Sequence, residues 1–285
     1  MIQSMTGYGK ATLQLPSKKI TVEIKSLNSK NLDINTRVSA TYREKELSMR
    51  DRLAKSLVRG KVDFSLYIEN LAEVTTARLN EPVVKEYMTQ LQNIIDGEEL
   101  ELLKMAIRMP DTLKTEREEV DEFEFQHIME AVDTALVAIN KYRTDEGKVL
   151  EEDFLKRSNK IADLLEAVIA VDPQRMENVK ERLRKAITEL KETVDENRFE
   201  QELVYYLEKY DITEEKVRLT NHLNYFNENI HSSVSNGKKL GFITQEIGRE
   251  INTIGSKANF APMQQLVVQM KDELEKIKEQ ALNVL

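Results

Sequence analysis

The chain has 285 residues, enough for one large domain or two modest ones. It contains no cysteine, which excludes disulfides, thiolate metal sites and cysteine catalysis. The net charge of −8 is unevenly spread, because residues 1–61 carry 13 basic and 5 acidic side chains while the remainder is acidic. Such a basic segment either pairs with the acidic remainder or forms a face that binds a polyanion.

The first 70 residues alternate apolar and polar side chains in short runs, the pattern of half-buried strands. Strands are expected within residues 3–14, 20–27 and 32–38, followed by a helix over 43–57 and a strand over 61–70. The order βββαβ predicts a small mixed layer.

From Asn80 onward the spacing of apolar residues is helical almost to the end. The acidic, proline-containing segment 109–125 is expected to be a loop. A long helical pattern follows, with an interruption at Gly147 and a new start at Pro173. Residues 174–210 are expected to form one long, solvent-striped helix.

The last 70 residues predict three helices, separated by polar breaks at "SSVSNG" and "NFAP". The fold class is therefore α+β: a small N-terminal layer followed by a mainly helical region. We expect an N-terminal α+β domain over residues 1–155 and a helical domain over residues 156–285.

The segment 243–258 has three distinct faces when it is placed on a helix. An apolar stripe predicts burial: Ile243, Ile247, Ile251, Ile254 and Ala258. Beside it, Gly248 and Gly255 share one line, although glycine costs a helix about 1 kcal/mol relative to alanine. We expect another backbone, from protein or ligand, to approach closely there.

The third face of this segment is polar. It is either a solvated surface with i,i+4 ion pairs or a surface that meets a phosphate or a metal-bound water. It consists of Glu246, Arg249, Glu250, Thr253 and Lys257, flanked by Gln245, Asn252 and Ser256.

A second polar group lies in "TEEKVRLTNHLNYF", where Glu215, Arg218 and His222 fall on one helical face. A carboxylate, a guanidinium and an imidazole in a row suit general acid–base work on a phosphodiester. The alternative is a histidine on an ordinary charged surface. A third cluster, "TDEGKVLEEDF" over residues 144–154, either holds Mg²⁺ or Mn²⁺ or is a solvated helix face.

Several segments appear in the order of one known family: "SMTGYG", "VEIKSLNSKNLDINTR", "RGKVDF", "DEGKVL", "EEKVRLTNHL", "GKKLGFITQEIGREINTIGSKA" and "VVQMKDELEKIKEQALNV". The chain therefore resembles the YicC family from residue 3 to about residue 283, most weakly between about 95 and 140. Gly241 departs from that pattern, since the family usually has an acidic residue there, and Gly248 replaces a usual asparagine.

The resemblance implies a bacterial, metal-dependent endoribonuclease that cleaves single-stranded or structured RNA, including small regulatory RNA. It also implies a homo-oligomer, expected to be a hexamer, that clamps RNA in a central channel. Neither DNA nor a membrane is an expected partner. The expected cofactor is Mn²⁺ or Mg²⁺.

Roles follow from residue chemistry combined with the resemblance. We expect catalysis by His222, Glu246, Arg249 and Glu250, and metal binding by Glu215, Glu246 and Glu250. RNA contacts are expected from Lys25, Lys30, Arg37, Arg218, Lys239, Gln245, Asn252, Ser256 and Lys257.

Two other functions fit the same sequence. A non-catalytic adaptor for RNA decay would need the basic residues but not the carboxylates. A structural helical oligomer would use the polar faces as subunit contacts. For all three functions we expect a cytoplasmic protein, because the first residues do not resemble a signal peptide and no apolar run reaches 18 residues.

Overall fold

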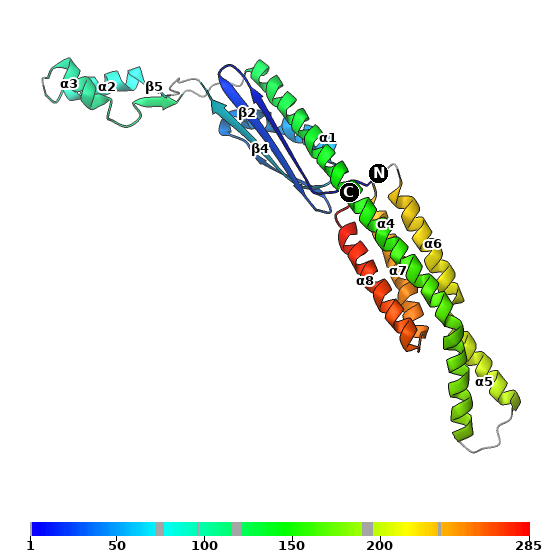
Figure 1. Cartoon of the computed structure of the whole chain (residues 1–285). Helices are drawn as coiled ribbons and strands as arrows, with labels where there is room; N and C mark the ends of the chain where they lie inside the picture. The colour runs from blue at the N-terminus through cyan, green and yellow to red at the C-terminus, as the bar shows by residue number, and fades with distance from the viewer. Residues whose placement is uncertain (1, 72–76, 96, 116–120, 190–195, 233–234) are drawn as a thin grey trace.

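A computed structural model describes most of the chain (Figure 1). The residues that it describes are 2–71, 77–95, 97–115, 121–189, 196–232 and 235–285.

The N-terminal part contains a four-stranded sheet in the order β1-β2-β4-β3. Neighbouring strands are antiparallel except β3 and β4, which are parallel. A short 3₁₀ turn, η1 (Ala40–Lys45), and helix α1 (Glu46–Leu57) connect β3 to β4. The predicted βββαβ layer is thus confirmed. The strands are β1 (Gly7–Gln14), β2 (Lys18–Leu27), β3 (Leu32–Arg37) and β4 (Gly60–Asn70).

One face of this sheet is buried and the other is open. Ile20, Val22 and Ile24 of β2 are fully buried beneath α1 and the first part of α4, in one cluster with Leu53. The alternate residues of β2 point away from both helices, as the strand period of two requires. A large polar surface is therefore left uncovered.

An arm extends from the sheet between β4 and α4 (Figure 1). It contains β5 (Ala77–Leu79), α2 (Glu81–Gln92), α3 (Glu99–Ala106) and β6 (Leu113–Thr115). The expectation of a loop over 109–125 holds for residues 109–112, is wrong for 113–115 and 122–125, and falls outside the described residues at 116–120. Strand β6 pairs with β5, because a partner distant in sequence outweighs a weak local pattern, and α4 already begins at residue 122.

Helix α4 (Glu122–Glu189) is 68 residues long and runs from the sheet into the helical part (Figure 1). The predicted interruption at Gly147 and the predicted new start at Pro173 were both wrong. Contacts from other elements hold the helix at each point: the backbone of Ile2 packs on Gly147, and Arg175 is hydrogen-bonded to two neighbouring segments. The expected domain boundary at residues 155/156 lies inside this helix and stays a prediction.

Four antiparallel helices form the second core. The later part of α4 packs with α6 (Thr213–Ile230), α7 (Gly237–Lys257) and α8 (Ala261–Ala281). The three predicted C-terminal helices are confirmed. The single helix expected over 174–210 is instead the end of α4 and a separate α5 (Glu196–Lys209), with part of the segment outside the described residues.

The N- and C-terminal segments meet between the two cores. Ser4 forms a bridge with Val284, and Met5 donates its amide hydrogen to the carbonyl oxygen of Asn283 at 2.7 Å. These bonds explain why β1 begins at Gly7 and not at residue 3 as expected. In the described part of the chain, no helix is long and apolar enough to cross a membrane.

Candidate functional site

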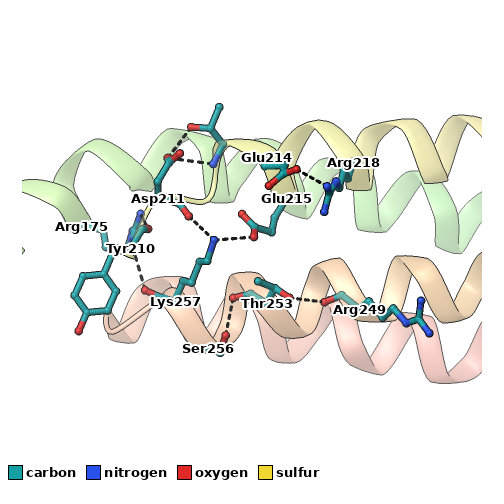
Figure 2. A network of polar contacts seen from close by, with 11 residues as sticks. Arg175, Tyr210, Asp211, Glu214, Glu215, Arg218, Arg249, Thr253, Ser256 and Lys257 are labelled. Atoms are coloured by element: carbon teal, nitrogen blue, oxygen red, sulfur yellow. Dashed lines mark hydrogen bonds and ion pairs between the residues drawn. The ribbon is translucent and has the colours of Figure 1, made fainter. Parts of the chain in front are cut away.

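The polar residues singled out in the sequence converge on the antiparallel pair α6 and α7. The ammonium of Lys257, in the last turn of α7, donates to Oε1 of Glu215 in the first turn of α6 at 2.7 Å (Figure 2). The same ammonium donates to the carbonyl oxygen of Asp211 at 2.8 Å. Glu215 is only 6% exposed, and its second oxygen, Oε2, is buried without a hydrogen-bond partner. One unsatisfied carboxylate oxygen therefore remains at this end of the pair.

A second set of contacts fixes the loop that precedes α6. Arg175 of α4 donates to the carbonyl oxygens of Tyr210 at 2.9 Å and Lys257 at 3.2 Å (Figure 2). It also pairs with Asp172 at 2.7 Å. Lys216 reaches the same carboxylate at 2.8 Å. Three helices are thus joined around Glu215, which limits how far its carboxylate can move.

The hydroxyl of Thr213 donates to Asp211 at 2.7 Å, and this bond is the main reason that the pKa of the Asp211 carboxyl lies below its usual range. The same carboxylate accepts from the amide of Thr213, the first residue of α6, at 3.2 Å.

The helix register relates His222 to Glu250. A step of seven residues from the Glu215–Lys257 contact leads forward to His222 on α6 and backward to Glu250 on α7. Seven residues return a side chain to nearly the same face, so this places His222 and Glu250 at one level of the antiparallel pair. His222 is partly buried, and Glu250 is 8% exposed. Within the described residues, Glu250 makes no hydrogen bond or ion pair.

The outer face of α7 is solvent-facing. Glu246 pairs with Arg249 at 2.7 Å, and Arg218 of α6 pairs with Glu214 (Figure 2). Both pairs are the i,i+3 or i,i+4 contacts expected of a solvated helix surface. Other expected RNA-binding residues of this helix are also exposed: Gln245, Asn252 and Ser256.

The apolar stripe of α7 is buried as predicted. The glycine line, however, does not admit a ligand or another backbone. A Cβ on Gly248 would lie 3.3 Å from Leu274, and one on Gly255 would lie 3.0 Å from Val267, both side chains of α8. These glycines allow α8 to pack against α7.

The proposed metal ligands are not gathered into one group. Among the described residues, no three His, Cys, Asp or Glu side chains are placed to hold a metal ion. Glu215 is bound to Lys257 and Glu246 to Arg249, which directs these carboxylates toward cations of the protein itself. The donor set of a single chain therefore does not fit a metal centre built from Glu215, Glu246 and Glu250.

The acidic segment 144–154 is part of α4, and most of its carboxylates have partners. Glu146 accepts from the Thr6 hydroxyl at 2.7 Å, and Asp153 pairs with Arg157 at 2.7 Å. These contacts fit the alternative of a solvated helix face, because the carboxylates bind protein groups in place of a shared metal ion.

The basic N-terminal residues lie on the sheet and in the loop that faces the start of α7. Lys25 and Arg37 project from the open face of the sheet, and Lys25 lies over the ring of Tyr8, 5.7 Å from its centroid. Lys30 is exposed in the loop after β2. Lys239 lies 4.9 Å from the ring centroid of Tyr225, and hydrogen bonding to Lys239 lowers the pKa of that phenol.

Sequence reasoning missed Asp172, Lys216 and Arg175. Arg175 is 2% exposed, yet it follows a proline in a run of charges and resembles a surface residue in the sequence. Its two carbonyl partners lie 35 and 82 residues away along the chain. No local pattern could have identified this residue.

Replacing Lys257 by methionine is expected to lower the free energy of unfolding by about 2 kcal/mol. The substitution leaves the Glu215 carboxylate buried and unpaired, and the loss is smaller than for a fully buried pair because the Lys257 side chain is 30% exposed. Urea denaturation measures it, with Lys271→Met as the exposed-lysine control. Adding Glu215→Gln should recover part of the loss; a double variant less stable than Lys257→Met would contradict the assignment.

Comparisons with known proteins cover nearly the whole chain. Residues 2–152 match the family model described as "Endoribonuclease YicC-like, N-terminal region", and residues 168–285 match "Endoribonuclease YicC-like, C-terminal". The chain is 33% identical over 293 residues to a Clostridioides difficile protein named "Probable endoribonuclease YicC", with 100% of each chain covered. It is 28% identical over 287 residues to a Haemophilus influenzae protein of the same name, again with 100% of each covered.

Proposed function

Because the chain belongs to the YicC-like endoribonuclease family, we propose that it cleaves RNA internally and that the reaction takes place along the α6–α7 pair. The observation that carries this assignment is the Glu215–Lys257 contact between α6 and α7. The helix register places His222 and Glu250 at one level of the same pair, seven residues along each helix from that contact.

His222 is the residue suited to proton transfer, since a neutral imidazole takes a proton from the attacking oxygen and an imidazolium gives one to the leaving oxygen. Glu250, at the same level, is suited to orient the imidazole and to stabilise its protonated form. Lys257 and Arg249 would offset phosphate charge, and the exposed guanidinium of Arg249 can do so with two hydrogen bonds.

The open face of the sheet is suited to hold the RNA strand. Lys25 and Arg37 are exposed there with two aromatic side chains, Tyr8 at 41% and Tyr67 at 53% exposure. Lysine and arginine attract phosphates, and an exposed tyrosine ring can stack on a base of any sequence. Binding to this face should therefore weaken strongly as salt is raised.

A requirement for Mn²⁺ or Mg²⁺ stays a proposal that rests on Glu246 and Glu250, one helical turn apart on α7. A single chain gathers too few carboxylates for a metal centre of its own among the described residues. None of the roles given to His222 and the cations depends on such an ion.

We also propose a homo-oligomer, assembled through the arm; a hexamer is the number that the family resemblance implies. The arm exposes large apolar side chains, among them Ile94 at 82%, Ile95 at 67% and Leu113 at 63%. A segment of about 40 residues is too short to bury a stable core by itself. A second copy of the chain would cover these side chains.

The double substitution Ile94→Glu and Ile95→Glu is accordingly expected to reduce the subunit number measured by light scattering after size-exclusion chromatography. The substitution would weaken assembly, because glutamates buried at the interface would face apolar surface without partners. Val137→Glu is the matched control, since Val137 is 71% exposed on α4, outside the arm. An unchanged mass of the arm variant would rule out assembly through this surface.

The experiment that tests the function is cleavage of an end-labelled structured RNA by the purified protein, with Mn²⁺, with Mg²⁺ and with EDTA. Glu246→Gln is assayed alongside, and the oligomeric state is measured on the same samples. Internal cuts by the wild-type protein support the proposal, and loss of cutting in EDTA and in the variant supports a metal bound near Glu246. Tight RNA binding with no cutting under any of the three conditions would instead identify an adaptor.

A further inference from the structure

A pocket of about 610 Å³ lies between the two cores, away from the α6–α7 row. Its wall combines the loop after β2, the turn before β4 and the start of α7. The motifs "SLNSKN", "RGK" and "NGKKLG", separated by up to about 200 residues in the sequence, come together there. The polar lining residues are Asn28, Ser29, Lys30, Asn31, Arg59 and Lys238, and no lining residue is acidic.

Among the described residues, the three cations of this pocket, Lys30, Arg59 and Lys238, form no ion pair with a carboxylate. Arg59 donates from Nη2 to the carbonyl oxygen of Val284 at 2.6 Å, and its Nε is buried with no hydrogen-bond partner. A buried donor without a partner costs about 1–3 kcal/mol.

The start of α7 adds a backbone donor and a favourable helix dipole. The side chain of Asn236 accepts from the amide of Lys239 at 3.0 Å, and the oxygen of Leu285 accepts from the amide of Gly237 at 3.0 Å. Within the described chain, the amide of Lys238, between these two, has no hydrogen-bond partner. Free amides at a helix N-terminus favour anions.

The turn that carries Arg59 is strained. Val58 has a φ of 49°, which is rare for a β-branched residue, and Gly60 has a φ of 126°. Strain of this kind costs about 1–3 kcal/mol and persists where the surroundings hold it, often at binding sites. Here it holds the Arg59 side chain between the sheet and the C-terminal segment, at the pocket wall.

We propose that this pocket binds a phosphate group of RNA, a proposal that rests on the function proposed above. Lys30, Arg59 and Lys238 offset the phosphate charge, while the amide of Lys238 donates to one of its oxygens. The phosphate is either a 5′-terminal monoester or a diester within the strand. The pocket thus gives the protein a second RNA contact, separate from the site of cleavage.

The test uses the full-length double variant Lys30→Gln/Lys238→Gln, which changes two exposed side chains and leaves the strained turn intact. Lys271→Gln, an exposed lysine on α8, is the matched control. Fluorescence anisotropy measures the Kd of single-stranded RNA carrying a 5′-phosphate or a 5′-hydroxyl, over a range of salt. Melting temperatures of the three proteins are also compared with and without inorganic phosphate at constant ionic strength.

The double variant is expected to bind 5′-phosphorylated RNA about tenfold more weakly, because two charge-assisted contacts are lost. The slope of log K against log salt should become shallower by about 0.7 for each lost contact. A terminal phosphate in the pocket predicts that only the 5′-phosphorylated RNA loses affinity, whereas an internal diester predicts equal losses for both RNAs. The wild type should gain more thermal stability from phosphate than the variant does.

Two results would overturn the proposal: a double variant that binds RNA like the wild type, or a Lys271→Gln control that loses as much affinity. If the wild-type protein binds no RNA at all, the proposed function fails. Phosphate binding in the pocket is then tested independently of RNA, by whether inorganic phosphate raises the melting temperature of the wild type more than that of the double variant.

Discussion

Replacing His222 by alanine is expected to lower the rate constant of RNA cleavage by about 10²–10⁴-fold, the usual contribution of a general acid or base. RNA affinity should change little, because the imidazole offsets little of the negative charge of the phosphates. Single-turnover cleavage with protein in excess separates the two quantities. The expected loss is the largest of any single substitution, since His222 is the histidine that lies level with a buried carboxylate.

The control for this substitution is His127→Ala. His127 lies in the first turns of α4, where its ring bonds the carbonyl oxygen of Phe123, distant from α6 and α7. It should keep wild-type activity. If His222→Ala retains half of the wild-type rate or more, the α6–α7 row is not the site of proton transfer and the chemistry must be sought elsewhere.

Gly147→Ala is expected to lower the free energy of unfolding by about 3 kcal/mol, although alanine is the better helix former. A Cβ at this position would lie 2.0 Å from the carbonyl oxygen of Ile2 and 2.7 Å from its carbonyl carbon. The N-terminal segment would have to move away from α4, and its bridge to Val284 would be strained. Urea denaturation gives the free energy, and hydrogen exchange of Ser4 and Met5 reports the displacement.

Gly241→Ala is the matched control, because Gly241 also lies inside a helix, yet a Cβ added there would meet no described atom within 4 Å. It should raise the free energy of unfolding by up to about 1 kcal/mol. Opposite signs for the two substitutions would show that packing, not helix propensity, requires Gly147. A stabilised Gly147→Ala protein would contradict the close approach of Ile2.

Local patterns were sufficient to predict the elements whose residues alternate or repeat regularly. The strands around Ile20, Val22 and Ile24 and the isoleucine stripe of α7 are examples, because burial of one face imposes the pattern directly. The continuity of α4 was not predictable in this way. A glycine and a proline within a helix normally indicate breaks, and here their neighbours are supplied by residues 2 and 257, far away in the sequence.

In the candidate site, too, local patterns predicted the faces of single helices but not the contacts between helices. The sequence placed Glu215 and His222 on one helical face, and Glu250 and Lys257 on another, but it could not show that the two faces oppose each other. That relation depends on the packing of α6 against α7, which brings Lys257 to Glu215 over a separation of 42 residues. The glycine line was misinterpreted for the same reason, since the identity of its neighbour is a tertiary property.

Helix α4 is continuous from the sheet to the α6–α7 pair, and this sets a length scale for the substrate. Arg143, which contacts the sheet region, and Asp172, which contacts Lys216 at the start of α6, are about 45 Å apart at about 1.5 Å per residue. His222, six residues further along α6, lies about 9 Å nearer to the sheet. Under the proposed function, the continuous helix fixes the distance between the sheet face proposed to hold the RNA strand and the α6–α7 row proposed to cleave it. Fragments too short to span that distance would contact only one of the two places, so they would dissociate as end products and would not be trimmed further.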